Sequence, residues 1–271
     1  GRGVLGEGHG GQGERQRAIH RRPTHSVFIL TRRRLSYNAV TVTRRNLLLG
    51  GVAAALRREN LDEAARLIAA RAASGEVAGA VLHVQNGGGV FERAFGVART
   101  PRAVFLLASI TKPMTATAVM ILVDRGRLSL DDPVQKVIPE FRGGERGKVL
   151  VRHLLTHTSG LPDMLPEDTA LRERHAPLTD FVQAACRTPL LFSPGTKVQY
   201  QSMGVLLAGE MVERVTRLPL REFMRREMFT PLGMQATSLG LGGRKIADTM
   251  PSQDDRKTDW DWNSLYWRDL G

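Results

Sequence analysis

The feature that most constrains the fold is a pair of short strand-like runs, residues 80–84 and 90–95, joined by the glycine-rich stretch QNGGG. A glycine turn between two such runs is typical of a β-hairpin. Because a two-stranded hairpin is marginally stable on its own, this pair needs further strands or a covering helix. A helical pattern begins at Leu61 and closes near Gly75, just before the hairpin. The order predicts a helix laid on an antiparallel hairpin, which is the start of an α/β layer.

The chain after the hairpin is predicted to be mostly helical. From Ser109 to Arg125 apolar residues recur at helical spacing, and Gly126 suits the end of that helix. A short helix is expected to end at Gly160 and Pro162, another to begin at residue 179 or 180, and two more to lie within residues 204–234. No further strand is evident, and the sequence stops in an aromatic-rich stretch. We therefore expect the chain to be truncated, with the later strands of the sheet missing.

Basic residues are concentrated at the start of the chain. Residues 1–45 contain ten arginines and two glutamates, and so carry about +8 of the formal charge of +12. We interpret residues 1–43 as a disordered basic extension. The arginine clusters in it lack interleaved aromatic residues, so nucleic-acid binding is not predicted. Residues 57–271 are expected to form the folded domain.

The pair Arg44 and Arg45 precedes a short apolar run, and residues 44–56 resemble a twin-arginine export signal. The run is too short to span a bilayer, which needs about 20 residues. This interpretation predicts a periplasmic or extracellular protein with no stable membrane span. The alternative is that residues 47–70 form one amphipathic helix of a cytoplasmic protein.

Ser109 lies three residues before Lys112, where the apolar helical pattern starts. Side chains at this spacing share one face of a helix, so the Lys112 amine is expected within reach of the Ser109 hydroxyl. A serine becomes a nucleophile when a base accepts its proton. Burial and the positive end of the helix dipole both favour the uncharged amine that could do so. The alternative is that Ser109 caps the helix and Lys112 is solvated.

Three segments, ASITKPMTATAVMILVDRGRLSLDDPVQKVIPEF, VRHLLTHTSGLPD and SPGTKVQYQSMGVLLAGEMVE, occur in this order. Together they resemble the serine β-lactamase and penicillin-binding-protein superfamily, in its class C-like branch that includes esterases and D-stereospecific peptidases. The resemblance runs from about Leu61 to Gly271. It implies an α/β fold of the β-lactamase/transpeptidase type, with an antiparallel sheet flanked by helices and an all-helical subdomain, and an active site between them.

The resemblance also implies roles for single residues. Ser109 would be the acylated nucleophile and Lys112 its basic partner. Tyr200 matches the tyrosine of a Tyr-x-Asn motif, where the phenol or phenolate passes the proton to the leaving group. The asparagine of that motif is Ser202 here, a substrate-binding position, so β-lactam recognition is less expected than ester cleavage. The late Lys-Thr-Gly or His-x-Gly triplet is absent, so this fragment is expected to lack part of the catalytic machinery.

Other candidate sites are weaker. His153 and His157 are spaced for one zinc ion but have no evident third ligand, so no metal or other cofactor is predicted. Ser159 and Ser202 lack the glycine that a nucleophile elbow requires. Cys186 is the single cysteine, typical of helix packing.

The sequence thus predicts a serine hydrolase that cleaves an ester, amide or lactam of a small molecule or peptide through a Ser-linked acyl-enzyme. A carboxylesterase or D-peptidase is favoured over a β-lactamase. The alternative is a non-catalytic cleft that binds peptidoglycan-like peptides or a protein partner.

Overall fold

The computed structural model describes residues 58–86, 89–253 and 261–270. All of them belong to the unit Ala55–Gly271, and the other unit, Gly1–Ala54, lies outside the described residues. The predicted basic extension, residues 1–43, and the predicted export signal, residues 44–56, therefore also lie outside them. No helix in the described part is both long enough and apolar enough to cross a membrane.

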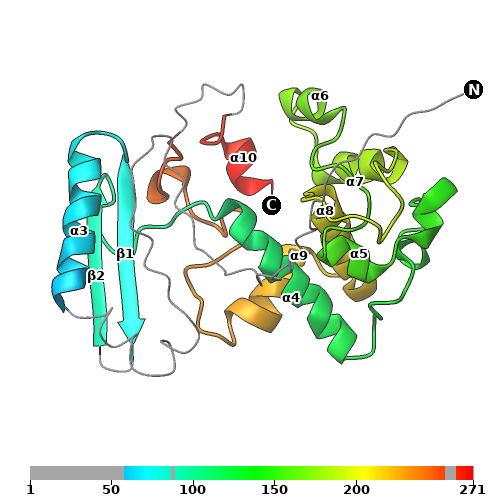
Figure 1. Cartoon of the computed structure of the whole chain (residues 1–271), viewed down its shortest axis with the longest axis horizontal. Coiled ribbons are helices and arrows are strands. Elements are labelled where there is room, and N and C mark those ends of the chain that lie inside the picture. The colour runs from blue at the N-terminus through cyan, green and yellow to red at the C-terminus, as the bar shows by residue number, and fades with distance from the viewer. Residues whose placement is uncertain (1–57, 87–88, 254–260, 271) are drawn as a thin grey trace, which may run out of the picture. The chain divides into compact units, whose positions relative to one another are not determined.

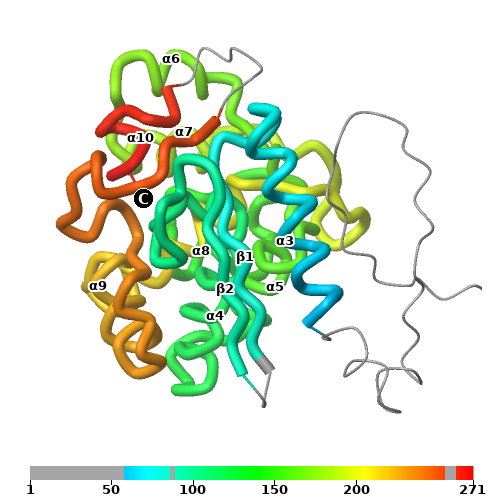
Figure 2. Tube along the Cα trace, turned by 90° about the vertical axis from the view of Figure 1, so that its left-hand side faces the viewer, coloured from blue at the N-terminus to red at the C-terminus, as the bar shows by residue number. Residues whose placement is uncertain are grey.

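A helix and a hairpin form the first layer, as the sequence predicts. Helix α3 spans Arg58–Ala73, strand β1 spans Gly79–Asn86 and strand β2 spans Gly89–Gly96. The strands pair antiparallel, with Gly79 opposite Gly96, and α3 lies along them (Figures 1 and 2). Within the described residues these two strands make up the whole sheet.

The hairpin ends where the backbone comes close to itself. Gly96 has a φ of 59°, and a Cβ atom there would lie 2.1 Å from the Ala78 carbonyl oxygen. Only glycine fits this position, because it lacks the Cβ atom and adopts positive φ without strain. The turn leads the chain from β2 into the segment that carries Ser109.

The helical block follows the hairpin and contains most of the core. It consists of α4 Thr111–Asp124, α5 Val151–Leu155, α6 Asp168–Glu173, α7 Leu178–Arg187, α8 Met203–Thr216 and α9 Leu220–Met224. Helix α8 packs against α4, α5, α7 and α9 and is thus central to the block (Figure 1). Val119 and Leu122 of α4 and Leu207 and Met211 of α8 are completely buried.

The helix predicted over 109–125 starts later than expected. Residues Ala108–Ile110 form a 3₁₀ turn (η1), and α4 begins at Thr111. Pro113 is compatible with this start because the first N–H groups of a helix have no intrahelical partner. The other end is as predicted: Gly126 has a φ of 65° and terminates α4.

Two other helix boundaries differ from the prediction. Helix α5 ends at Leu155, before Gly160, because His157 adopts a left-handed backbone conformation with a φ of 59°. Helix α7 begins at Leu178, directly after Pro177, rather than at residue 179 or 180. Proline has no backbone N–H and therefore suits the start of a helix.

The last part of the chain connects the two layers. Here a π-helical turn, Arg225–Phe229, continues α9, and a 3₁₀ turn lies at Ile246–Asp248. Two further 3₁₀ turns, Val134–Lys136 and Gly144–Lys148, lie earlier, between α4 and α5. The Met250 N–H donates to the Val104 carbonyl over 2.7 Å, and the Ala78 N–H donates to the Gln253 side chain over 2.7 Å. Helix α10, Leu265–Asp269, is anchored by Tyr266, whose hydroxyl donates to the Ala176 carbonyl.

Candidate active site

The nucleophile candidate Ser109 lies in the 3₁₀ turn before α4 and is exposed. The preceding Ala108 has a φ of 46°, a left-handed conformation that costs a non-glycine residue about 1–2 kcal/mol. The N-cap residue of α4 is Ile110, and no side chain caps this helix. Ser109 is therefore not an N-cap, and its hydroxyl is available for other partners.

Two predicted side chains, Lys112 and Tyr200, meet at Ser109. The Lys112 Nζ atom donates a hydrogen bond to Ser109 Oγ over 3.2 Å. The Tyr200 hydroxyl lies 2.6 Å from the same Oγ atom, although it comes from 91 residues further along the chain. Lys112 Nζ also lies 4.8 Å from the centroid of the Tyr200 ring. The structure thus brings Ser109, Lys112 and Tyr200 into direct contact.

The Tyr200 phenol has a shifted pKa. Burial by itself would raise that pKa, but Lys112 and the hydrogen bond with Ser109 outweigh burial and leave the pKa of Tyr200 below its ordinary value. The negative charge of Asp163 acts against this lowering. A phenol with a lowered pKa is deprotonated more often near neutral pH than an ordinary tyrosine, and can therefore take part in proton transfer.

The backbone around Tyr200 is fixed by His157. The His157 carbonyl accepts the Gln199 N–H over 2.9 Å, and His157 Nδ1 accepts the Gln201 N–H over 3.4 Å. The imidazole also packs on the Tyr200 ring, with 5.0 Å between centroids and 37° between planes. This residue, which by its spacing from His153 is also a candidate metal ligand, contacts the segment before and after Tyr200.

Gln201 anchors the same segment from the inside. Its side chain is fully buried, where it accepts a hydrogen bond from Ser159 Oγ over 2.6 Å and donates to the His153 carbonyl over 3.4 Å. Ser159 also accepts the Leu161 N–H over 3.1 Å. Ser159 thus contributes to the structure, and the short segment 153–161 supports the tyrosine.

Ser202, the predicted substrate-binding position, is directed toward a carboxylate. Its Oγ donates a hydrogen bond to Asp163 Oδ1 over 2.7 Å. No motif in the sequence singles out Asp163; its only signal is its place directly after the HTSGLP stretch. The hydroxyl and the carboxylate together give the site a polar edge.

The described residues offer no cluster suited to a metal ion. They contain no group of three or more histidine, cysteine, aspartate or glutamate side chains that could hold one. His153 Nδ1 accepts the Leu150 N–H, and burial, with a contribution from Arg152, lowers the His153 pKa. Cys186 is buried, and this burial raises its pKa to about 11, so its thiolate form is scarce.

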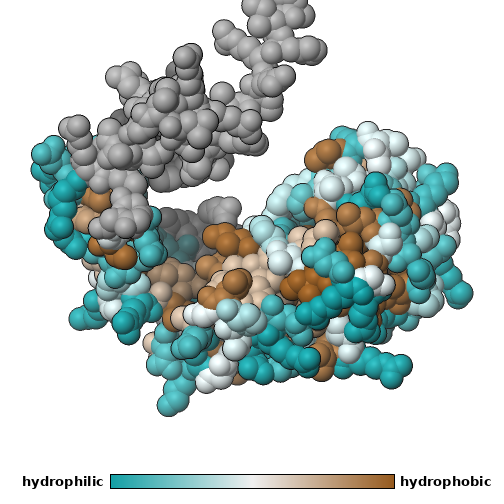
Figure 3. Space-filling model, turned by 90° about the horizontal axis from the view of Figure 1, so that it is seen from below, coloured by the Kyte–Doolittle hydropathy of each residue, from teal (hydrophilic) through white to brown (hydrophobic). Residues whose placement is uncertain are grey.

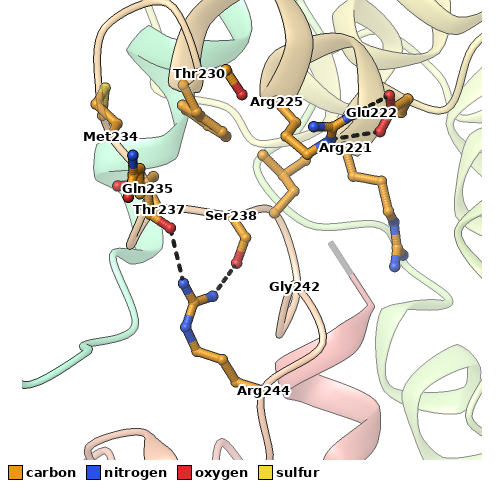
Figure 4. Close-up of a pocket in the computed structure, with 12 residues that line it drawn as sticks. Arg221, Glu222, Arg225, Thr230, Met234, Gln235, Thr237, Ser238, Gly242 and Arg244 are labelled. Atoms are coloured by element: carbon orange, nitrogen blue, oxygen red, sulfur yellow. Dashed lines mark hydrogen bonds and ion pairs between the residues drawn. The ribbon is translucent and has the colours of Figure 1, made fainter.

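A pocket of about 420 Å³ lies elsewhere in the described part and is lined by residues of the segment 221–244 (Figure 4). Its arginines are engaged by protein groups: Arg225 with the Glu222 carboxylate, and Arg244 with Ser238 Oγ and the Leu241 carbonyl. Ser109, Lys112 and Tyr200 do not line this pocket. Apolar surface is exposed on the face of the protein shown in Figure 3.

The fold and the contact between Ser109, Lys112 and Tyr200 are now described, and the family of the chain follows from comparison with known proteins. The Beta-lactamase family model matches residues 64–270, so the chain belongs to the beta-lactamase family. This result confirms the predicted superfamily and fold, while the class C-like branch stays a prediction.

Three of the relatives carry the names of an esterase and of two amide hydrolases. Esterase EstB of Burkholderia gladioli is 37% identical over 162 residues, covering 54% of this chain and 41% of the esterase. A D-amino acid amidase from Ochrobactrum anthropi SV3, solved with L-phenylalanine amide, is 25% identical with a TM-score of 0.64 over 78% of this chain and 64% of the amidase. A D-stereospecific amidohydrolase from Streptomyces sp. is 32% identical with a TM-score of 0.56 over 64% of this chain and 55% of that protein. The chain thus spans about two fifths of the length of EstB.

Proposed function

We propose that the protein is a serine hydrolase that cleaves an ester, amide or lactam bond through an acyl-enzyme on Ser109. The observation that carries this proposal is the position of Ser109 Oγ, which lies 3.2 Å from Lys112 Nζ and 2.6 Å from the Tyr200 hydroxyl. Two groups able to exchange protons thus lie within hydrogen-bond reach of one hydroxyl, which is the arrangement that an activated nucleophile requires.

The reaction would proceed in two stages. In the first, Ser109 Oγ attacks the carbonyl carbon while its proton passes to the uncharged Lys112 amine. The carbonyl oxygen takes the electron pair and returns it when the bond to the leaving group breaks, and Tyr200 relays the proton to that group. In the second, water attacks the acyl-enzyme, the acid is released and Ser109 regains its proton. The lowered pKa of Tyr200 supports its part in the relay.

An ester or amide is the favoured substrate. Ser202 has a short hydroxyl in place of the motif's asparagine amide, and this hydroxyl is already engaged with Asp163. The similarity to an esterase and to two amide hydrolases points in the same direction. We therefore place a carboxylesterase or D-peptidase ahead of a β-lactamase. Turnover of a p-nitrophenyl ester beside a chromogenic cephalosporin tests this order, and preference for the cephalosporin would reverse it.

Covalent labelling tests the nucleophile. The full chain is incubated with a fluorophosphonate probe and its mass is measured, and we expect one adduct that maps to Ser109 and is absent in Ser109→Ala. Ser74→Ala is the matched control, because Ser74 is an exposed serine whose hydroxyl donates to the Arg71 carbonyl at the end of α3. Equal labelling of Ser109→Ala and the unchanged protein would refute the proposal. Peptide binding without an adduct would favour the non-catalytic alternative.

Export through the Arg44–Arg45 segment is a separate proposal that rests on the sequence alone. Fusion of residues 1–60 to a reporter that is active only after translocation tests it. Replacement of both arginines by lysine is expected to abolish the signal, and an unchanged signal would contradict this route.

A further inference from the structure

The pocket lined by residues of the segment 221–244 carries more positive than negative charge (Figure 4). It is formed by α9, by the π-helical turn that continues α9 and by the loop that leads to Arg244. Its charged lining residues are three arginines and one glutamate, namely Arg221, Arg225, Arg244 and Glu222. A positive charge without a counter-ion in a pocket favours an anionic ligand, so the partners of the three arginines decide what the pocket can bind.

Two of these arginines have carboxylate partners within the protein. Arg225 donates two hydrogen bonds to the Glu222 carboxylate, over 2.9 and 2.6 Å, and thereby holds the pKa of Glu222 below its ordinary value. Arg221 lies 3.8 Å from Asp269 Oδ1 and donates a hydrogen bond to the Asp269 carbonyl over 3.3 Å. The charges of Arg221 and Arg225 are thus compensated by the protein itself.

Arg244 differs from the other two, because its partners are uncharged. Its Nη1 donates to Ser238 Oγ and to the Leu241 carbonyl, each over 3.0 Å, and its Nη2 donates to the Gln235 carbonyl over 3.4 Å. Within the described part of the chain no carboxylate forms an ion pair with Arg244, which lies apart from the Arg225–Glu222 pair in Figure 4. The Arg244 side chain is half-buried, so its charge is only partly compensated by water.

The remaining donors of Arg244 suit a carboxylate. A guanidinium has five N–H donors. The three hydrogen bonds of Arg244 leave its Nε–H and one Nη2–H without a partner among the described residues. The Arg244 Nε atom is also accessible, since the buried side-chain nitrogen or oxygen that lacks a partner in the described part is Arg146 Nε. Because two N–H groups of one guanidinium can bind both oxygens of a carboxylate, an organic acid matches these donors.

The same pocket offers apolar surface beside the charge. Phe229, Met234 and Leu239 line it, and the side chains of Met234 and Leu239 are only half-buried. A volume of about 420 Å³ falls in the range of pockets that hold small organic molecules, about 300–1,000 Å³. An inorganic anion would leave these apolar groups without a contact, whereas a carbon chain or ring would cover them.

We infer that this pocket binds a small organic acid, in which one carboxylate pairs with Arg244 and an apolar body contacts Met234 and Leu239. The site is a different one from the contact at Ser109, and the inference does not depend on the proposed hydrolysis. It assigns to Arg244 the recognition of the anion and to the apolar lining residues the selection of its body.

Binding of matched probes to the full chain tests the inference. The acid is 4-phenylbutyrate, and 4-phenyl-1-butanol has the same carbon skeleton without the charge. By calorimetry we expect the acid to bind about tenfold more tightly than the alcohol, because only the acid forms charge-assisted hydrogen bonds with the guanidinium. Acetate and inorganic phosphate lack the apolar body and should bind about tenfold more weakly than the acid, or weaker still.

Hydrogen exchange locates the bound acid without any substitution. We expect 4-phenylbutyrate to slow amide exchange in peptides from the segment 221–244, where the pocket lies. Slowed exchange confined to other parts of the chain would overturn the inference.

A pair of arginine variants assigns the anion contact. Arg244→Gln should lower the affinity for the acid about tenfold, to that of the alcohol. Arg93→Gln is the matched control, because Arg93 donates to the Glu92 carbonyl, is exposed on β2 and does not line the pocket. This control should leave the affinity unchanged. Equal affinities for acid and alcohol, tighter binding of phosphate, or a preference for the acid that survives Arg244→Gln would overturn the inference. If Arg244→Gln does not fold, the affinities and the exchange of the unchanged protein still decide.

Discussion

The helical block and the hairpin layer are stabilised in different ways. In the block, apolar side chains of α4 and α8 are completely buried against each other. In the layer, α3 has no buried residue, and Phe91 is the only buried one among the described side chains of α3, β1 and β2. The block thus has a core of its own, whereas the layer exposes most of its surface.

This difference matters because the candidate site belongs to the block. Ser109 lies in the 3₁₀ turn before α4, Lys112 lies in the first turn of α4, and Tyr200 lies just before α8. The two helices pack directly against each other, so the contact between serine and tyrosine depends on the best-packed part of the described protein. We therefore expect perturbations of the block to affect stability and labelling together, and equivalent changes in the layer to affect neither.

The largest difference is expected from two aspartate–arginine pairs with the same spacing. In α6, Asp168 is 1% exposed and its carboxylate lies 2.5 Å from Arg172, which stacks on Trp267. In α3, Asp62 and Arg58 form a solvent-exposed pair at 3.7 Å. Asp168→Asn should lower the free energy of unfolding by about 3–5 kcal/mol, because it breaks an ion pair whose carboxylate is buried. Asp62→Asn should cost about 0–1 kcal/mol. Urea unfolding measures both, and equal costs would contradict the comparison.

Two leucine truncations test the cores with smaller expected effects. Leu207 in α8 is fully buried, whereas Leu67 in α3 is 53% exposed. Leu207→Ala should destabilise the protein by about 2–5 kcal/mol through loss of apolar contacts and a residual cavity. Leu67→Ala should change stability by about 0.5 kcal/mol or less. Thermal unfolding followed by circular dichroism compares them, and a larger loss for Leu67→Ala would show that the layer has the more important core.

His157 tests whether the backbone clamp positions Tyr200. His157→Ala removes the acceptor for the Gln201 N–H and the ring contact with Tyr200. We expect fluorophosphonate labelling to slow by about tenfold, because small misplacements of catalytic groups reduce rates by up to about 100-fold. His157→Asn should recover much of the rate, since asparagine tolerates positive φ and offers a side-chain acceptor. If both variants lose the same rate, the clamp has no positioning role.

The smallest effect concerns the pH dependence of labelling. Because the pKa of Tyr200 is lowered, the phenolate form of Tyr200 becomes populated at lower pH than that of an ordinary tyrosine. The labelling rate should therefore rise with pH in that lower range. Asp163 raises that pKa, so Asp163→Asn should move the rise to lower pH. Asp124→Asn, at an exposed position at the end of α4, should leave the profile in place. A shift to higher pH in Asp163→Asn would show that the charge acts in the opposite sense.

The sequence predicts those parts of the molecule that depend on local spacing. The hairpin follows from its glycine turn, and the contact between Lys112 and Ser109 follows from their three-residue separation. Tyr200 could be placed only through resemblance to a family, because nothing local relates it to a serine 91 residues away. The contacts of His157 and Asp163 depend on tertiary packing between the segments 153–163 and 199–202. No periodic pattern in the sequence indicates this packing. The left-handed Ala108 also has no sequence signal, since alanine rarely adopts positive φ.

Tyr200 is exposed and Gln201 is buried, and this difference limits where insertions and deletions are tolerated in the chain. One side chain points to the reacting groups and the next one is fixed inside the protein. Because His157 holds the backbone of Gln199 and Gln201, deletion of a single residue between Gln199 and α8 would move these side chains from their positions. We therefore expect insertions and deletions to be tolerated only before Gln199. The number of residues from Gln199 to α8 is in this sense as important for the site as the side chains themselves.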